Sequence, residues 1–363
     1  GVGIMVVSLS IGESVVFYTI VFFISSAVLK VKLNNIFHRL LLASILPFFI
    51  SGFRYNVGWD YGSYAWGYDL FETDVSILDF FKDYQLGDSI GLDLVQLLTK
   101  SMNSKFLFFA ITAMLALVPV FLFLLEEWDC EKNILQLAAF ATCYTLLFTE
   151  YSAIKQGIAI GFCVYSLKYV FRRKPINYLI CILIAFMFHA SALVFIPVYF
   201  FWSYERNVTG WKKILIIIVS ILFVLFSGEI LTRFGGDRFS GYATQIIETG
   251  NLTFYLMVMW LIIFLVCRRT LLDLDKRNEL LILLYAIGTI FMLFGFRNAF
   301  VKRIAYYFDV TQILLIPQLM YVFNKRSRKV AKILIGIYFI LICVRYNTGT
   351  ATNMAPIPYS FLF

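Results

Sequence analysis

The sequence predicts an all-α protein, a polytopic transmembrane helical bundle whose solvent is mostly lipid. Of the 363 residues, 61% are hydrophobic and 15% are charged, whereas soluble domains are about half apolar and about a quarter charged. Mean hydropathy is +0.83. Apolar runs recur along the chain, and in lipid only helices or closed barrels satisfy their backbone hydrogen bonds internally. These observations favour a single integral membrane domain over residues 1–363.

About twelve apolar runs are candidates for membrane spans, which need roughly 17–25 residues each unless they are broken or tilted. The two runs on either side of His189 are short, which indicates either two tilted helices or a break between half-helices at this residue. The runs lie near 11–29, 39–53, 105–125, 133–150, 156–171, 176–188, 189–202, 213–232, 252–267, 279–296, 304–323 and 333–345.

Basic residues are distributed unevenly between the turns. If the turn after the first span is cytoplasmic, the turns on that side hold 20 of the 31 lysines and arginines. These turns are 30–39, 126–132, 168–174, 204–213, 268–277 and 325–332. Cytoplasmic turns are enriched in basic residues, so both termini are predicted to lie outside. The same turns account for the net charge of +9, and no nucleic acid is expected as a partner.

Two outer segments follow from this orientation. The longer one, 54–104, carries eight acidic residues and aromatic pieces such as 79–81, and the shorter one is the loop 233–251. We expect the longer segment to form short amphipathic helices on the membrane surface.

The sequence offers no sign of a metal, a nucleotide or a disulfide framework. Five of the six cysteines fall inside apolar runs, none has metal-ligand spacing, and the outer region has no Asp-x-Asp pair. Glycine-rich phosphate-binding motifs and the zinc-protease motif are absent. No basic region precedes the first apolar run, so no cleavable signal is expected. We therefore predict that the protein uses no cofactor. The energy for its activity would come from the substrate or from an ion gradient.

Three arginines lie where a predicted span meets the outer surface: Arg54, Arg297 and Arg303. A guanidinium is always charged and binds phosphate oxygens in a bidentate manner, so arginines at this depth suit the pyrophosphate of a lipid. The alternative is that each side chain extends to the interface and contacts lipid headgroups. Their common depth favours the first interpretation.

Two residues are candidates for proton transfer. His189 interrupts an apolar run and could accept a proton or donate an oriented hydrogen bond, unless it is a helix-end histidine satisfied by a backbone carbonyl. Asp60 follows a glycine that permits a tight turn, and its carboxylate could accept a sugar hydroxyl proton. An ion pair between Asp60 and Arg54 that only holds the loop is the alternative.

Phenol, amide, ammonium and carboxylate groups near the same surface could bind sugar hydroxyls or lipid phosphate. Some of them, Glu150 above all, could equally be ordinary turn residues. The candidates are Tyr61, Tyr64, Glu150, Lys155, Gln156 and Tyr306.

Four short patterns together resemble the EpsG/Wzy-like polysaccharide polymerases, which make O-antigen, capsule or exopolysaccharide. The segment Arg54–Tyr64 resembles the opening signature of that family, and Phe188–Ala192 resembles its F-H-x-S-A element. Lys155–Ala159 resembles its Arg-Gln-x-x-Ala element, with lysine in place of the usual arginine. Arg303–Phe308, with Pro317 downstream, resembles its late R-x-x-Y-Y segment.

The resemblance implies a multi-pass enzyme of the bacterial cytoplasmic (inner) membrane, similar to the membrane glycosyltransferases of the C type, with its active site on the periplasmic face. A glycan on undecaprenyl pyrophosphate would be transferred to one new lipid-linked repeat unit, without a nucleotide sugar or a metal. Arg54, Arg297 and Arg303 would bind the pyrophosphate, and His189, ahead of Asp60, would be the base. Further candidate partners are membrane lipids, a chain-length regulator and a flippase.

Two other functions stay open at this stage. An O-antigen ligase-like glycosyltransferase shares the chemistry, but such ligases usually carry their large outer loop late in the chain, whereas 54–104 is early. A polysaccharide flippase or transporter predicts paired internal repeats and broken helices at the midplane, and the sequence has no such symmetry.

Overall fold

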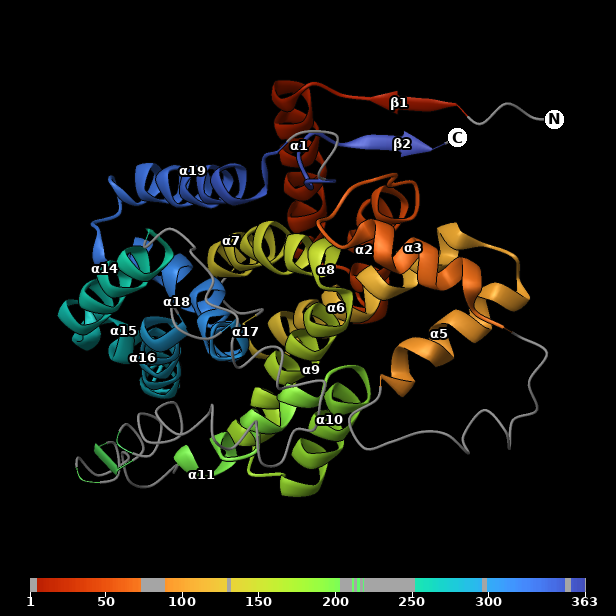
Figure 1. The fold of residues 1–363 in the computed structure, drawn as a ribbon. Helices are drawn as coiled ribbons and strands as arrows, with labels where there is room; N and C mark the ends of the chain where they lie inside the picture. Colours follow the sequence, from red (N-terminus) through yellow and green to blue (C-terminus); the bar gives the residue numbers. More distant parts are fainter. Residues whose placement is uncertain are drawn as a thin grey trace. The chain divides into compact units, whose positions relative to one another are not determined.

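The computed structural model is helical along nearly the whole described chain, so the prediction of an all-α protein is confirmed (Figure 1). Among the described residues, the exception is one small sheet formed by the strands β1 (Val6–Ser8) and β2 (Ser360–Leu362). The structure describes residues 5–72, 89–128, 132–202, 211, 214–215, 218, 252–295, 299–349 and 354–362. Arg297 and the predicted outer loop 233–251 lie outside the described residues, as does 73–88 of the longer outer segment.

The described helices form two compact units. The first comprises Gly1–Lys168, Ile176–Leu193 and Lys329–Phe363, and the second comprises Tyr169–Pro175 and Val194–Arg328. The prediction of a single integral membrane domain over residues 1–363 stays a prediction.

The first unit is built around α6, whose buried side is rich in alanine and phenylalanine. The helix α2 packs against α6, and α1 packs against both α2 and α7. A capping box of Ser10 and Glu13 begins α1, and Ser104 caps α6 by accepting a hydrogen bond from the Leu107 amide. The helices of this unit are α1 (Ile11–Lys30), α2 (Ile36–Gly52), α3 (Tyr61–Leu70), α5 (Ile90–Ser101), α6 (Lys105–Glu127), α7 (Lys132–Thr142), α8 (Phe148–Ser152), most of α9 (Ile154–Phe171), most of α10 (Pro175–Phe188) and α19 (Arg328–Asn347).

The second unit is built around α16, which packs closely against α17 and also against α14. Buried amides of Asn278 and Gln318 donate hydrogen bonds to each other at 2.6 and 2.8 Å. The helices of this unit are α11 (Val198–Phe201), α14 (Leu252–Val266), α15 (Arg268–Leu274), α16 (Asn278–Gly295), α17 (Ala299–Asp309) and α18 (Gln312–Gln318).

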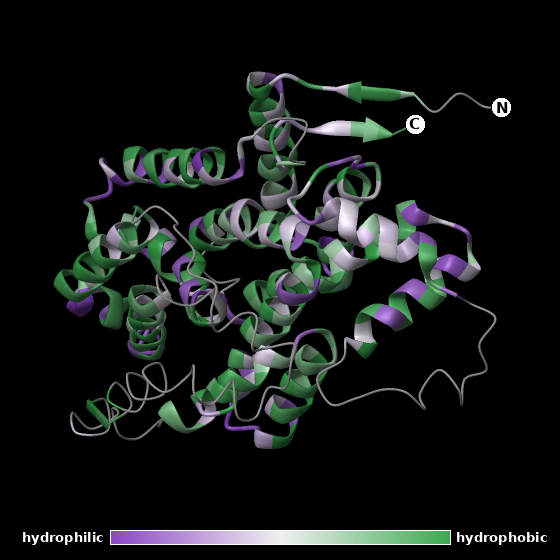
Figure 2. Ribbon diagram, in the orientation of Figure 1, coloured by the Kyte–Doolittle hydropathy of each residue, from purple (hydrophilic) through white to green (hydrophobic). Residues whose placement is uncertain are grey.

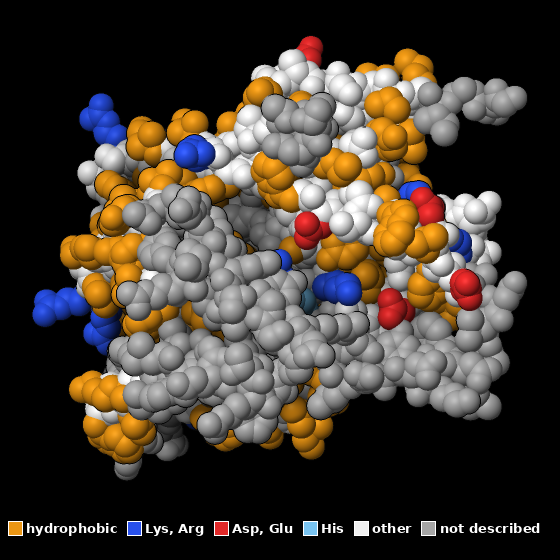
Figure 3. Space-filling model, viewed as in Figure 1, with side chains coloured by type: hydrophobic (Ala, Val, Ile, Leu, Met, Phe, Trp, Pro, Cys, Tyr) orange, Lys and Arg blue, Asp and Glu red, His pale blue; other side chains and the backbone are white. Residues whose placement is uncertain are grey.

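Four described helices are long and apolar enough to cross a membrane: α1, α6, α16 and α19. A fifth span results if α14 and α15, which are bent by 70° at their junction, are counted as one. Apolar residues run along most of the helices (Figure 2), and apolar side chains cover much of the described surface in Figure 3. The chain is therefore a multi-pass membrane protein, and the total of about twelve spans stays a prediction.

The short apolar runs around His189 form a broken helix. The helix α10 ends at Phe188, and a 3₁₀ helix, η2 (Ala190–Phe195), follows it. Of the two arrangements that the sequence left open, the structure has the break at the histidine.

The two chain ends meet in the β1–β2 sheet, where Val6 pairs with Leu362 and Ser8 with Ser360. Figure 1 shows the two strands side by side near the two ends of the chain, and strands that pair directly must lie on the same side of a membrane. Such an arrangement requires an even number of crossings; the predicted orientation, with both termini outside, stays a prediction.

Candidate functional site

The segment after α2 is held by the end of the chain, residues 354–362, which we call the C-terminal strap. The Tyr55 amide donates to the Ser360 carbonyl at 3.0 Å, and the Gly58 amide donates to the Met354 carbonyl at 2.7 Å. The Tyr359 hydroxyl donates to the carbonyl of Ile50 at 2.5 Å. These hydrogen bonds fix the backbone path of residues 53–58, and with it the position of Arg54.

Gly58 is required by the backbone path of this segment. Its φ is +117°, and a Cβ there would overlap the carbonyl oxygen of Tyr151 in α8. The glycine thus lets residues 55–60 lie directly on α8.

We expect Gly58→Ala to lower the free energy of unfolding by on the order of 3 kcal/mol, because it adds backbone strain and a clash with main-chain atoms. Thermal unfolding of the purified protein would measure the loss. Gly67→Ala is the control: no atom lies within 4 Å of a Cβ at that position in α3, so stability should change little or rise slightly. Equal unfolding temperatures for the two variants would contradict the packing described here.

Arg54 is buried against an acidic partner and two aromatic rings. Its terminal nitrogen Nη2 lies 3.6 Å from Oε1 of Glu150, and neither side chain is exposed. The guanidinium carbon is 4.7 Å from the ring centre of Phe109 and 4.2 Å from that of Tyr151. Aromatic faces attract cations, so the rings stabilise the charge while they exclude water.

Glu150 reaches this position through an irregular helix. A π-helical turn, η1 (Cys143–Leu147), joins α7 to α8, which carries Glu150 and Tyr151. Such turns often occur at functional sites because they change the direction of the side chains that follow. In α9, Gly157 faces Glu150, and a Cβ there would lie 2.6 Å from the Glu150 Cα. The backbone of Glu150 is thus fixed on one side by close packing.

Tyr61 joins the same cluster. It begins α3, is 4% exposed and stacks on Phe109 with ring centres 4.7 Å apart. Burial raises the pKa of Tyr61 to about 12, so the phenol stays protonated at neutral pH and can donate a hydrogen bond. Tyr61 is therefore suited to binding an oxygen of a ligand, and unsuited to acting as a base.

The other predicted residues of this segment lie nearer the surface. Asp60 immediately precedes α3 and is exposed, and Tyr64 is half-buried one turn further on. The sequence offered Asp60 as the ion-pair partner of Arg54, but the structure gives that place to Glu150. Lys155 is half-buried and Gln156 is buried in the first turn of α9, close to Glu150 in the chain.

His189 lies at the break between α10 and η2. Its ring nitrogen Nδ1 is 2.5 Å from the Ser191 hydroxyl, and the side chain is half-buried. The neighbouring Phe188 packs against Gly91 of α5, so the helix α5, part of the longer predicted outer segment, adjoins this break. The contact to Ser191 orients the ring, and proton transfer would then use Nε2.

Arg303 and Tyr306 belong to the second unit. Both lie on α17 one turn apart; Arg303 is exposed and Tyr306 is half-buried, whereas the adjacent Tyr307 is fully buried. This spacing places the guanidinium and the phenol on neighbouring positions of one helix surface.

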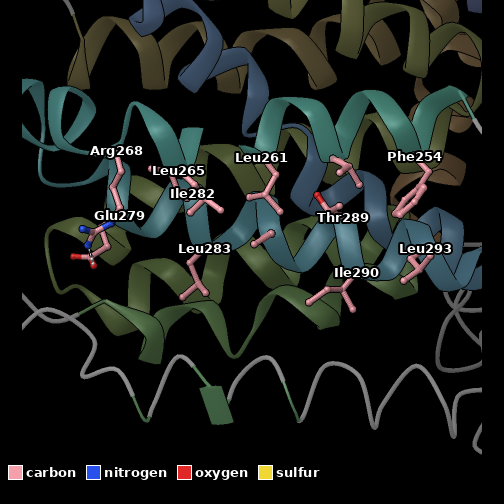
Figure 4. Close-up of a pocket in the computed structure, with 12 residues that line it drawn as sticks. Phe254, Leu261, Leu265, Arg268, Glu279, Ile282, Leu283, Thr289, Ile290 and Leu293 are labelled. Atoms are coloured by element: carbon pink, nitrogen blue, oxygen red, sulfur yellow. Dashed lines mark hydrogen bonds and ion pairs between the residues drawn. The ribbon is translucent and has the colours of Figure 1, made fainter. Parts of the chain in front are cut away.

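The second unit also contains an apolar groove of about 480 Å³ along α14 and α16 (Figure 4). An ion pair between Arg268 and Glu279, 2.8 Å long, closes one end, and Phe254 and Leu293 lie toward the other. Sequence reasoning missed this groove. The signal was present as apolar residues at helical spacing on α14, including Val258, Leu261 and Leu265, but a buried core stripe has the same spacing.

These features define a multi-pass helical membrane protein with a buried, aromatic-walled arginine at the start of its longer predicted outer segment. The chain belongs to the EpsG family, whose model matches residues 38–361. Family membership indicates a polysaccharide polymerase type of glycosyltransferase. Among curated proteins and solved structures, no match to the chain is found.

Proposed function

We propose that the protein joins oligosaccharide repeat units carried on undecaprenyl pyrophosphate and releases undecaprenyl pyrophosphate. The reaction takes place at the outer face of the bacterial cytoplasmic membrane, in a bundle of about twelve spans that resembles glycosyltransferases of the C type. The observation that carries this proposal is the buried guanidinium of Arg54, which offers a positive charge in a water-excluded place next to the predicted outer surface.

The proposed glycosyl transfer needs a cation to stabilise its leaving group, and it needs no metal and no nucleotide. The hydroxyl oxygen of the acceptor sugar attacks the anomeric carbon of the donor glycan, and the bond from that carbon to the pyrophosphate oxygen breaks. Charge develops on the departing pyrophosphate, so fixed positive groups in a place of low dielectric lower the barrier most. We assign this role to Arg54, Arg297 and Arg303.

The acceptor hydroxyl must lose its proton during the transfer. We assign Nε2 of His189 as the proton acceptor, in the tautomer in which Nδ1–H donates to the Ser191 hydroxyl oxygen. Tyr61, Tyr64, Lys155, Gln156 and Tyr306 are proposed to bind sugar hydroxyls or phosphate oxygens. The apolar groove on α14 and α16 supports the proposal, since a hydrocarbon chain could lie against such a surface.

Polymer length in cells tests the proposed function. The protein would be expressed in a strain that lacks its own polymerase and supplies the matching repeat unit, and the surface glycan would be resolved on a gel. We expect a ladder from the wild type and a single repeat from Arg303→Ala, because loss of a phosphate-binding cation costs at least about a hundredfold in rate.

The control is Arg326→Ala, an exposed arginine in the turn 325–332 that is predicted to be cytoplasmic, which should keep the full ladder at equal protein level. A full ladder from Arg303→Ala would remove Arg303 from the site. If the wild type itself left lipid core with no repeat attached, the ligase or flippase function would be favoured instead.

A further inference from the structure

The ion pair of Arg54 and Glu150 has a long nitrogen–oxygen distance for a buried pair. Bidentate arginine–carboxylate pairs have nitrogen–oxygen distances near 2.7–2.9 Å, whereas the salt-bridge contact here is a single one of 3.6 Å. Within the part of the chain that the structure describes, none of the three guanidinium nitrogens of Arg54 has a hydrogen-bond partner. The five N–H donors of the Arg54 guanidinium are thus buried next to one distant carboxylate and two aromatic rings.

A buried ion pair with unused hydrogen-bond donors stabilises the fold poorly. It is better suited to releasing the carboxylate and binding another anion. Buried charges cost much free energy unless their hydrogen bonds are satisfied, so a purely structural pair is expected to close to bidentate contact. A guanidinium with its donors unused can instead take the oxygens of a phosphate, whose geometry matches the planar fork.

We infer that Glu150 is the resident counter-ion of Arg54 and is displaced from it when the phosphate groups of the lipid-linked substrate arrive. This inference rests on the proposed function and changes the role of Glu150 from a sugar ligand to a positioning residue. Glu150 keeps the buried cation neutralised in the empty enzyme and competes with pyrophosphate for it.

The packing around the pair limits the exchange to movements of side chains. Gly157 fixes the backbone of Glu150 from one side, so the carboxylate can leave only by rotation of its own side chain. Residues 55–60 lie on α8 through Gly58, and Trp59 and Asp60 of that segment are exposed.

The competition has a consequence for turnover. Both the donor and the released carrier lipid bear pyrophosphate, so both would bind strongly to an uncompensated Arg54. A carboxylate that returns to Arg54 weakens the binding of each, and it thereby helps the product to leave. Removing the negative charge should lower KM and also lower kcat, because product release becomes slow.

Binding of inorganic pyrophosphate and of undecaprenyl pyrophosphate to the purified full chain in nanodiscs tests this inference. We expect Glu150→Gln to bind both probes roughly tenfold more tightly than the wild type, a change within the usual range of coupled binding. Glu150→Asp, whose shorter carboxylate stands further from Arg54, should show a smaller gain. Arg54→Gln and the double variant Arg54→Gln/Glu150→Gln should bind neither probe measurably.

Ligand-induced stabilisation separates competition from a structural role. Glu150→Gln should unfold at a lower temperature than the wild type without ligand, and pyrophosphate should raise that temperature more than it does in the wild type. Glu126→Gln is the matched control: it removes the partner of Lys168, 2.6 Å away, and should lower stability without changing pyrophosphate affinity.

The outcomes distinguish this inference from the proposed function. If the wild type makes polymer but Glu150→Gln binds pyrophosphate no more tightly, Glu150 is not a competing counter-ion, and the proposed function stands. If Glu150→Gln does not fold, unchanged or weaker binding by Glu150→Asp overturns the inference in the same way. If neither the wild type nor Glu150→Gln binds either probe and no glycan is extended, both proposals are wrong.

Discussion

Replacing Arg54 with glutamine should abolish polymer formation and lower the free energy of unfolding by about 3–5 kcal/mol. The substitution removes the cation that is proposed to bind the pyrophosphate, and it leaves the buried carboxyl group of Glu150 without its partner. It also removes the contacts of the guanidinium with the rings of Phe109 and Tyr151. Surface-glycan gels would measure the loss of function, and thermal unfolding in nanodiscs would measure the loss of stability.

The double variant Arg54→Gln/Glu150→Gln separates these two effects. It buries no charge at this position, so it should regain most of the lost stability through the coupling expected of a contacting pair. It should not regain polymer, because no cation is restored. Arg54→Lys keeps the charge without the planar fork and should polymerise weakly. A full ladder from Arg54→Gln at equal protein level would show that Arg54 lies outside the reaction.

The elements of the fold that the sequence predicted are those encoded locally. Apolar runs and their flanking polar residues placed α1, α6, α16 and α19 to within a few residues. The break at His189 was visible for the same reason, since the runs on either side were each too short to cross lipid. Arg54 and Tyr61 were proposed as site residues from residue type and from their position directly after a span; the structure brings both into contact with Phe109, and their role stays a prediction.

The features that the sequence could not supply depend on contacts between distant residues. The partner of Arg54 is Glu150, far away in the chain, whereas local reasoning offered Asp60, which proves exposed. A carboxylate six residues away is the simpler choice until burial is known, and burial is decided by helix packing. The C-terminal strap was missed because its strand β2 is only three residues long and pairs with the other end of the chain.

Replacing His189 with alanine should lower the rate of polymerisation by about 10²–10⁴-fold, the usual contribution of a positioned general base. The fold should be retained, because the side chain is half-buried and lies at a break in the helix. Initial rates of glycan extension with purified enzyme and lipid-linked repeat units would measure the effect. The wild-type rate should fall toward acid pH, since a protonated imidazole cannot accept a proton, and the residual rate of His189→Ala should lose this dependence.

The variant Ser191→Ala distinguishes a histidine that transfers a proton from one that only ends a helix. It removes the hydroxyl 2.5 Å from Nδ1 but leaves the imidazole in place, so it should reduce the rate less than His189→Ala and shift the pH profile. A histidine that only ends a helix would give no such shift, because its ring would take no part in proton transfer. If His189→Ala kept near-normal turnover while Asp60→Asn lost it, the acceptor of the proton would be Asp60. The exposed position of that carboxylate beside α3 would then mark where the acceptor sugar lies.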